Sequence, residues 1–318
     1  MAWSNYKKRG MMPTQIRLEQ LGPEVIEPYL EMLADPEGRR LTATTARFDR
    51  PQIFEWLSTR ASVPNRRDWA IKNDDTGEFL GEVVLNEFND AKNSINLRIA
   101  LRGPQVYGQG IGTQAVCLAL EYAFDELMVE KVTLEVLVDN IRAQRAYEKN
   151  GFVPKTQFSE KSLRYQRMVC TKPDYVEARA LALMKQHLDV SRWVFGWDNA
   201  KRRAGLCNYT ESKISISKYL VMAHSVDESL QVVLHEIAHA LSGKKEGHGK
   251  KWLATAKSIG YRAERFTGTE IAREVAPWRG QCPVGHEHYR YRKPTRPLSC
   301  GVCSRSFTAA NLITWMHV

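Results

Sequence analysis

Two histidines and a glutamate in the second half of the chain have the types and spacing of a metal-dependent hydrolytic site. His235 and His239 stand four residues apart in an HExxH motif, so on a helix both imidazoles lie on one face and reach the same ion. Glu236 follows His235 and is placed to polarise a water held there. A third imidazole, His248, lies nine residues after His239 between two glycines. Three protein ligands with an open fourth position are typical of catalytic zinc.

The residues around this motif predict the elements that position it. Apolar side chains predict a buried helix, and these are Val232, Val233, Leu234, Ile237, Ala238 and Leu241. Gly243 predicts the end of that helix, and residues 251–259 predict a second helix that returns the third imidazole to the ion. Two alternatives stay open. The two helix histidines could be core residues bonded to backbone, and Glu264 could supply a distal carboxylate ligand.

Cysteines near the end of the sequence predict a second metal site of a different kind. Cys300 and Cys303 form a CxxC knuckle, and Cys282 lies four residues before His286. Four soft or borderline ligands from two knuckles hold a structural zinc tetrahedrally. We choose His286 over His288 as the fourth ligand because it directly follows a glycine turn. The alternative is a loop-rich tail with free cysteines.

The charge of the chain is concentrated in its second half. Residues 1–170 carry 23 Lys+Arg and 23 Asp+Glu, whereas residues 171–318 carry 23 and 13 and hold all eight histidines. At 318 residues the chain is long enough for two domains, and this asymmetry predicts a boundary near 171–174. A basic domain attracts polyanions, of which nucleic acid is the commonest. A basic surface that merely confers solubility is the alternative.

The composition also bears on the compartment. The sequence has no apolar run of spanning length, and its polar, basic start (1–10) lacks the hydrophobic region of a secretion signal. Six cysteines without a dense spacing pattern favour a reducing compartment. We therefore expect a cytoplasmic protein with no membrane partner.

The neutral half predicts an α/β layer fold, because strand-like and helix-like runs alternate along it. Strands are expected at 14–19, 68–72, 79–88, 94–101 and 132–138, and helices at 23–34, 51–60 and 113–127. A glycine-rich loop, 102–112, joins a strand to the longest helix. Glycine lets backbone amides converge on an anion, and the helix dipole favours negative charge there. The loop therefore predicts a phosphate site, and an ordinary dinucleotide site is the alternative.

Two motifs of this half occur together. Gln105-x-x-Gly108-x-Gly110 is followed about thirty residues later by Asn140, Ala146-Tyr147 and Gly151-Phe152. In this combination residues 14–170 resemble the GNAT family of acetyltransferases. The resemblance implies the GNAT fold, a mixed and mostly antiparallel sheet flanked by helices, with acetyl-coenzyme A as co-substrate. The pattern is most similar to the branch that acetylates protein N-termini or small amines, with an acceptor pocket at about 34–50.

The resemblance also implies where the co-substrate binds. Its pyrophosphate would lie in the loop formed by Val106, Tyr107, Gly108, Gln109, Gly110, Ile111 and Gly112. The strand backbone near Ile99 and Ala100 would pair with the pantetheine arm, and Asn140 would contact the co-substrate.

Two further roles follow from the chemistry of acetyl transfer. Tyr147 matches the position that protonates the departing thiolate in the family, and a packing role is its alternative. The attacking amine must lose its proton, so a base is expected on the strand before the cleft. Glu82 and Glu87 are the candidates there, and Glu87 is carried into the predicted catalytic set.

The second half combines HExxH, a GHGxxW run, upstream Trp- and Phe-rich segments and the cysteine knuckles. In this combination residues 171–318 resemble the SprT-like metalloproteases, which include Spartan. Residues 193–198 and 214–217 predict strands that flank a basic hairpin loop at 201–205. The resemblance implies that the three histidines bind catalytic zinc and that Glu236 activates water for attack on a peptide carbonyl. The expected zinc ribbon at the end of the chain departs from the family pattern. Its first knuckle holds Cys282 and His286, where two cysteines are commoner.

Four parts are therefore expected. They are a tail (1–13), a GNAT acetyltransferase domain (14–170), an α+β SprT-like zincin domain (171–278) and a zinc ribbon (279–318). Zinc is expected twice, once catalytic and once structural.

Family members related to Spartan digest proteins crosslinked to DNA, and local residues are compatible with DNA contact. The run 288–293 interleaves rings with cations, and lysines flank the histidine turn at 244, 245, 250 and 251. We expect an acetyl-coenzyme A-dependent N-acetyltransferase fused to a zinc-dependent, nucleic-acid-associated peptidase with a protein substrate. In the alternative, the second half is a DNA- or partner-binding module that targets the transferase. The acetyl acceptor could also be a nucleobase amine or the protease domain itself.

Overall fold

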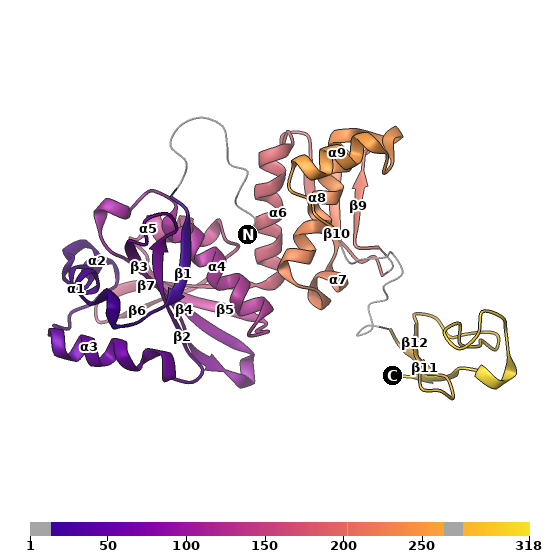
Figure 1. Ribbon diagram of the computed structural model, residues 1–318, viewed down its shortest axis with the longest axis horizontal. Helices are drawn as coiled ribbons and strands as arrows, with labels where there is room; N and C mark the ends of the chain where they lie inside the picture. The colour runs from indigo at the N-terminus through magenta and orange to yellow at the C-terminus, as the bar shows by residue number, and fades with distance from the viewer. Residues whose placement is uncertain (1–13, 202, 264–275) are drawn as a thin grey trace.

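The computed structural model describes residues 14–201, 203–263 and 276–318, which form three parts along the longest axis of the molecule (Figure 1). The first part contains residues 16–171, the second 172–258 and the third 278–317. The predicted tail 1–13 and the alternative ligand Glu264 lie outside the described residues.

Seven strands form one mixed sheet in the first part, in the order β1-β2-β3-β4-β5-β7-β6. They are β1 (Ile16–Gln20), β2 (Arg67–Asn73), β3 (Phe79–Asn89), β4 (Ser94–Leu101), β5 (Lys131–Leu137), β6 (Val153–Glu160) and β7 (Leu163–Thr171). Only β4 and β5 pair in parallel among these neighbours. The prediction of a mixed, mostly antiparallel sheet is confirmed.

Helices cover both faces of this sheet. They are α1 (Ile26–Ala34), α2 (Pro36–Leu41), α3 (Arg50–Thr59), α4 (Ile111–Asp125) and α5 (Ile141–Glu148). Buried residues of α1 and α3 pack with Ala70 and Phe79 in one cluster, and α4 packs on the opposite face in the main core. The helix predicted at 113–127 begins at Ile111, because Gly110 ends the loop in the left-handed conformation (φ 80°).

The centre of the sheet opens between its two parallel strands. β4 and β5 pair from Ser94–Asn96 to Lys131–Thr133, and the pairing stops there although both strands continue. Beyond this point the strands separate, and the glycine-rich loop and the first turn of α4 follow the end of β4. The gap exposes strand backbone next to a helix N-terminus, which is where the sequence places the co-substrate.

The second part packs helices against a small sheet of order β8-β10-β9. Its elements are α6 (Lys172–His187), β8 (Val194–Asp198), β9 (Gly205–Asn208), β10 (Lys213–Ser217), α7 (Lys218–Ala223), α8 (Val226–Ser242) and α9 (Lys250–Ser258). A capping box at Ser225 and Glu228 begins α8, and Gly243 ends it as expected. Leu241 in its last turn is 41% exposed, so the prediction that it is buried is wrong.

The basic hairpin loop predicted at 201–205 is also wrong. β8 and β10 run parallel, so the segment between them cannot be a simple hairpin turn. Residues 205–208 form β9 instead, antiparallel to β10 on its other side. The hairpin turn lies further along, where the Asn208 side chain accepts hydrogen bonds from the amides of Thr210 and Glu211.

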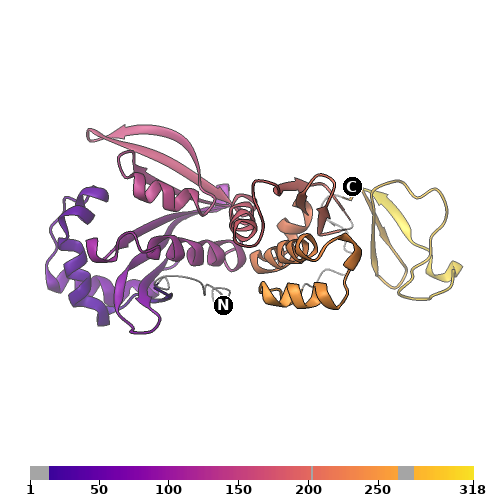
Figure 2. The same cartoon turned by 90° about the horizontal axis from the view of Figure 1, so that it is seen from above.

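The first two parts share one hydrophobic core. Helix α6 starts directly after β7, with Thr171 and Asp174 forming its capping box. On one side the Tyr175 hydroxyl lies 2.9 Å from the Cys117 sulfur of α4, and buried residues of α8 complete the same core on the other. Figures 1 and 2 show α6 between the large sheet and the helices of the second part. The predicted boundary at 170/171 therefore falls within a continuous apolar interior.

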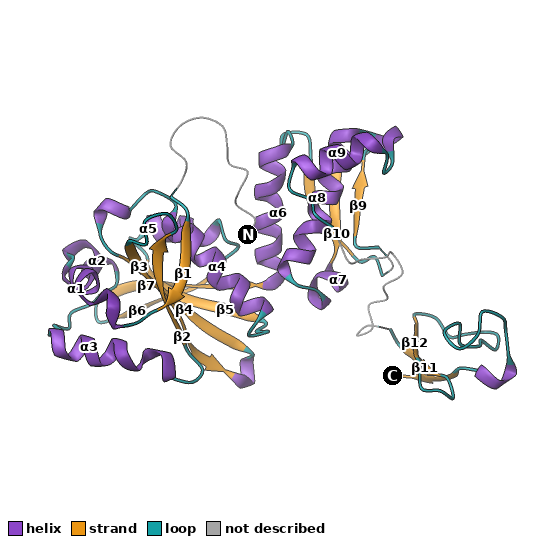
Figure 3. Cartoon of the chain, in the orientation of Figure 1, coloured by secondary structure: helices purple, strands orange, loops and turns teal. Residues whose placement is uncertain are grey.

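The third part is a three-stranded sheet with long loops (Figure 3). Its strands are β11 (Trp278–Gln281), β12 (Glu287–Arg290) and β13 (Thr314–His317), with β11 in the centre. Within the described ranges, no helix has both the length and the apolar character needed to cross a bilayer.

Candidate functional site

A cleft of about 1630 Å³ follows the gap between β4 and β5 and continues over the sheet face opposite α4. Most of the residues predicted to hold acetyl-coenzyme A line it: Ile99, Ala100, Val106, Tyr107, Gly108, Gly110, Ile111, Gly112, Asn140 and Tyr147. Gln109 is outside the lining, because its side chain turns back to the carbonyl oxygen of Gln105 at 2.6 Å. We refer to this space as the acetyltransferase cleft.

The glycine-rich loop presents bare backbone to the acetyltransferase cleft. Gly108 and Gly110 have φ angles of 76° and 80°, in the left-handed region that favours glycine. Open space surrounds the position of an added Cβ at both residues. Because no side chain caps α4 at Gly110, the amides of its first turn are available to an anion.

Polar contacts connect the two sides of the cleft near this loop. The Arg142 guanidinium lies 4.0 Å from the centre of the Tyr107 ring, and the Tyr107 hydroxyl donates to Asp35 at 3.4 Å. Arg40 of α2 pairs with Asp139, at the end of β5, at 3.0 Å. These contacts hold the loop, α2 and α5 together around the cleft.

Tyr147 is the buried phenol of the cleft. Its side chain is 7% exposed and packs edge-on against Phe152, with ring centres 5.7 Å apart. Burial raises the pKa of Tyr147 well above its ordinary value, so the phenol keeps its proton at neutral pH. Asn140 caps the same helix, accepting from the amide of Ala143 at 3.1 Å.

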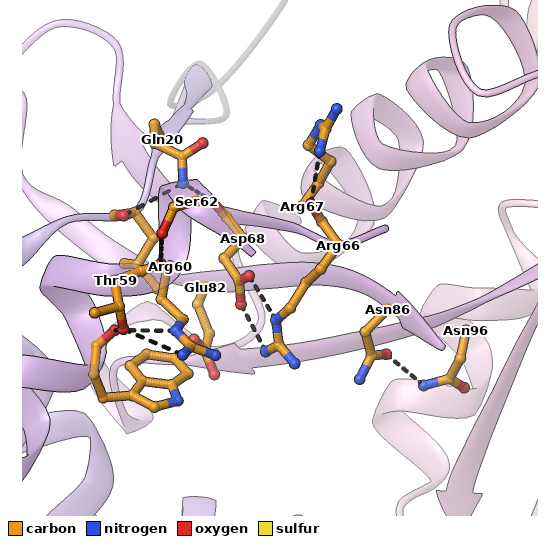
Figure 4. A network of polar contacts seen from close by, with 12 residues as sticks. Gln20, Thr59, Arg60, Ser62, Arg66, Arg67, Asp68, Glu82, Asn86 and Asn96 are labelled. Carbon is orange, nitrogen blue, oxygen red and sulfur yellow. Dashed lines mark hydrogen bonds and ion pairs between the residues drawn. The ribbon is translucent and has the colours of Figure 1, made fainter. Parts of the chain in front are cut away.

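A half-buried carboxyl group lies at the other end of the cleft. Glu82 accepts a hydrogen bond from the Tyr29 hydroxyl at 2.9 Å. Burial raises the pKa of Glu82, although the Tyr29 hydrogen bond opposes that shift. Figure 4 shows Glu82 beside Asp68 and Arg66, which form two hydrogen bonds of 2.6 and 2.7 Å. The sequence reasoning missed Tyr29, Arg66 and Asp68, which only the folded sheet brings to Glu82.

Glu87 has a different environment. It lines the cleft but is exposed, at a position in β3 where the strand register shifts and φ is 54°. A positive φ at a residue other than glycine is uncommon and marks a local irregularity of the strand. The two glutamates that the sequence offered as bases thus differ sharply in burial.

The three histidines of the second part meet at one point. Their Nε2 atoms are separated by 3.1 Å (His239 to His235), 3.1 Å (His239 to His248) and 3.0 Å (His248 to His235). A tetrahedral zinc about 2.0–2.1 Å from each nitrogen would hold its ligands about 3.4 Å apart. Burial and the two neighbouring imidazoles lower the pKa of His239 to about 4, so at neutral pH its lone pair is available. The donor set therefore fits a zinc ion.

Aromatic residues support the histidine cluster. The Trp252 ring of α9 lies 4.8 Å from the His235 ring and 4.7 Å from the His248 ring, centre to centre. The Tyr209 hydroxyl donates to the backbone carbonyl of His239 at 2.8 Å. The sequence gave no signal for Tyr209, because its contact with the helix is tertiary.

Glu236 is held between α8 and the edge strand β9. Glu236 is 7% exposed, and Gly205 of β9 packs directly against its side chain. A Cβ at Gly205 would lie 2.6 Å from the Glu236 Oε1 atom and 2.8 Å from the Val232 Cγ1 atom, both closer than real contacts allow. Glycine at this position is what lets the glutamate occupy its place beside the strand.

Cys282, His286, Cys300 and Cys303 gather in the third part. The His286 Nδ1 atom lies 3.2 Å from the Cys303 sulfur, 3.5 Å from the Cys282 sulfur and 3.6 Å from the Cys300 sulfur. All cysteines of the described residues are free thiols, so the sulfurs are not joined by disulfides. The three thiols and one imidazole fit a tetrahedral zinc, and His288 lies outside the group.

Two family descriptions match the chain. "Acetyltransferase (GNAT) domain" matches residues 15–153, and "SprT-like family" matches residues 177–274. The N-acetyltransferase 9-like protein of Caenorhabditis briggsae is 24% identical over 137 residues, which is 40% of this chain and 69% of that protein.

A spermidine N(1)-acetyltransferase of Vibrio cholerae is 32% identical over 83 residues, covering 26% of this chain and 47% of that protein. The match thus spans less than half of that relative. Among solved structures, the V. cholerae spermidine N-acetyltransferase in complex with CoA and spermine is 20% identical, with a TM-score of 0.47. That alignment covers 51% of this chain and 98% of the solved one. From the family matches, this chain joins a GNAT acetyltransferase domain at residues 15–153 to a SprT-like domain at residues 177–274.

Proposed function

We propose that the chain is a bifunctional enzyme, an acetyl-coenzyme A-dependent N-acetyltransferase and a zinc-dependent peptidase that acts on proteins associated with nucleic acid. The observation that carries the peptidase is the convergence of three Nε2 atoms within 3.1 Å beside Glu236. The observation that carries the transferase is the gap between β4 and β5, which leads to an uncapped helix N-terminus.

In the transferase, the loop amides and the N-terminus of α4 bind the pyrophosphate of acetyl-coenzyme A. The amine attacks the thioester carbonyl, and the carbon–sulfur bond breaks as the new amide forms. We assign the proton of the departing thiolate to Tyr147, which burial keeps protonated. We assign the proton lost by the amine to Glu82 in preference to Glu87, because burial makes Glu82 the stronger base.

Replacement of Tyr147 by Phe tests the transferase. We expect kcat for acetyl transfer to fall by about 100-fold, the scale of a lost general acid, while binding of coenzyme A is retained. Mass spectrometry after incubation with labelled acetyl-coenzyme A identifies the acceptor amine. Full activity of Y147F would remove the proposed proton donor.

In the peptidase, His235, His239 and His248 would hold a zinc ion, and Glu236 takes a proton from the attacking water and passes it to the leaving amine. When bound, zinc would polarise the peptide carbonyl and the water. Because Gly205 has no side chain, the Glu236 carboxylate can lie against β9. Glu236 directly follows His235 in the sequence. The cysteine cluster in 279–318 would hold a second, structural zinc.

Glu236→Gln tests the peptidase without removing a ligand. We expect cleavage of a DNA-bound protein to fall by about 100-fold or more, with two zinc per chain retained. Glu211→Gln is the matched control, because Glu211 is exposed in the turn between β9 and β10. Cleavage that persists in E236Q would favour the second candidate function, a zinc-stabilised module that targets the transferase to DNA or to a partner.

We propose nucleic acid as the partner of the basic half, in a reducing compartment such as the cytoplasm. The net charge of +10 lies in residues 171–318, and the side chains of Lys244, Lys245, Lys250 and Lys251 follow the metal helix. If about five cations touch phosphates, log K should fall with log salt with a slope near −0.7 per contact for single strands. Binding that does not change with salt would exclude this partner.

A further inference from the structure

The large sheet has two different faces. The face that packs on α4 is apolar, whereas the opposite face carries polar side chains where β4 and β5 cross it. Ile95 and Leu97 of β4 are buried in the core with α4, so the alternating residues Asn96 and Arg98 lie on the opposite face. The same alternation in β5 places Lys131, Thr133 and Glu135 on that face. All five line the acetyltransferase cleft, and we call this surface the polar floor.

The polar floor is basic once its internal ion pairs are removed. Arg66 is occupied by buried Asp68, and Arg167 pairs with Glu135 at 2.6 Å. The remaining charged groups of this part of the cleft are Lys92, Arg98, Lys131 and Lys155 against Glu82 and Glu87. The field at the floor is therefore positive.

These cations are separate from the side that faces the co-substrate phosphates. The basic residue beside the glycine-rich loop is Arg142, which stacks on Tyr107. Arg98, in contrast, is exposed on β4 and opposes Val84, two residue pairs along the strands from Glu82 and Ala100. A polyamine such as spermidine, which carries several positive charges, would be repelled by this surface.

We propose, resting on the transferase function above, that the acceptor is the free N-terminus of a peptide whose next residues are acidic. Arg98 lies two residues from Ala100 along β4, and Lys131 of β5 pairs with Ser94, four residues further back along β4. At about 3.3 Å per residue Lys131 is ~20 Å from Ala100 along the sheet, or about six residues of extended peptide. A small amine would not reach these cations together.

One amide of the polar floor suits a peptide backbone. Asn96 donates from Nδ2 to the Oδ1 atom of Asn86 at 3.0 Å (Figure 4). Asn86 is buried and outside the lining of the cleft, so Asn96 is the member of this pair that faces the cleft. The carbonyl oxygen of Asn96 can accept a hydrogen bond from the N–H of a peptide unit lying across the floor.

The test uses the full chain loaded with acetyl-coenzyme A and three peptides that share one N-terminal residue. Positions two to six are Asp/Glu in the first, Asn/Gln in the second and Lys in the third, and spermidine is the fourth acceptor. We expect KM for the acidic peptide to be about tenfold below that of the amide peptide, the scale of a few partly exposed charge pairs. The lysine peptide and spermidine should be poorer still.

The double variant Arg98→Gln with Lys131→Gln should remove most of that difference in KM between the acidic and the amide peptide. Lys185→Gln, exposed on α6 outside the cleft, is the matched control. Fluorescence anisotropy of a labelled acidic peptide on the CoA-loaded protein measures the same preference without turnover.

The outcomes separate the two proposals. Preference for spermidine or for the lysine peptide, or equal binding of acidic and amide peptides, overturns the acceptor class and leaves the transferase standing. Failure to bind coenzyme A overturns the transferase itself, whatever the peptides do. Binding of the acidic peptide that R98Q/K131Q does not weaken also overturns the role given to the polar floor.

Discussion

The acetyltransferase cleft and the histidine cluster distribute their working residues very differently. The cluster draws its three imidazoles from one helix and the turn after it, within residues 235–248. The cleft needs strand backbone, a glycine loop and side chains such as Tyr29 and Glu82, which are 53 residues apart in sequence. A local site depends on one ion and its ligands, whereas a distributed site depends on the whole sheet. The two should therefore respond differently to the same perturbation.

Metal removal gives the largest expected contrast. A chelator should reduce peptide cleavage by about 100-fold or more and leave acetyl transfer within about twofold, because the zinc ligands all lie after residue 234. Zinc content and both activities are measured on one sample, before and after zinc is restored. Parallel loss of both activities would show that the two sites are not independent.

Glu82→Gln is the corresponding test of the distributed site. We expect kcat/KM for acetyl transfer to fall by about 100-fold, because the amide cannot accept the proton. In the unmodified protein the rate should fall as pH is lowered through the raised pKa of Glu82, since only the ionised form is a base. This acid limb should disappear in E82Q. If the acid limb disappears in E87Q and remains in E82Q, the base is Glu87, as the sequence predicted.

Asp125→Asn tests whether the two regions are physically separate. Asp125 of α4 accepts from the amide of Val226 at 2.9 Å and pairs with buried Lys172 at 3.2 Å, so it connects α4, α6 and α8. Leaving Lys172 without its partner should lower the free energy of unfolding by about 2–4 kcal/mol. Urea unfolding followed by circular dichroism measures this change.

The control for that experiment is Asp227→Asn, whose partner Arg262 is 53% exposed. An exposed pair contributes little, so its loss should change the free energy of unfolding by less than about 1 kcal/mol. Equal effects of D125N and D227N would contradict the buried connection.

Gly205→Ala makes a smaller change, confined to the local site. The added methyl group would displace the Glu236 carboxylate, so we expect cleavage to fall by about tenfold and stability by about 1–3 kcal/mol. Zinc content and acetyl transfer should not change. Unaltered cleavage in G205A would show that the carboxylate position is not critical.

Tyr29→Phe has the smallest expected effect. The Tyr29 hydrogen bond lowers the pKa of Glu82, so its removal should raise that pKa and move the acid limb of acetyl transfer to higher pH. The displacement should be less than about one pH unit, the effect of a single neutral hydrogen bond. A limb that moves to lower pH would contradict the hydrogen-bond geometry.

Local patterns predicted most of the elements. Apolar runs located β1 to β5 of the large sheet, and proline, asparagine and glycine located helix ends such as Asn140 and Gly243. The strands β6 and β7 were not predicted. The parallel pairing of β8 and β10 was missed, because register between distant strands leaves no local signal. Leu241 was placed in the core because periodicity cannot tell where the covering elements end.

The candidate sites show the same limit. The residues that the sequence grouped at the histidine cluster and the cysteine cluster come together in space, because each group spans few residues. Their roles as ligands stay predictions until metal is measured. The surroundings of Glu82 could not be predicted, because Tyr29, Arg66 and Asp68 come from α1 and the start of β2. Tertiary contacts of this kind depend on sheet order.

The apolar interior that runs through α6 has a consequence for thermodynamic linkage. Tyr175, Val176, Ala180 and Met184 face α4 and α8 in one cluster, so neither half can lose its structure without exposing the other. A ligand that binds only one half then raises the melting temperature of both, by an amount set by its concentration and affinity. Coenzyme A would therefore raise the melting temperature of the SprT-like part, and a fragment cut at residue 171 would expose the apolar face of α6 and aggregate.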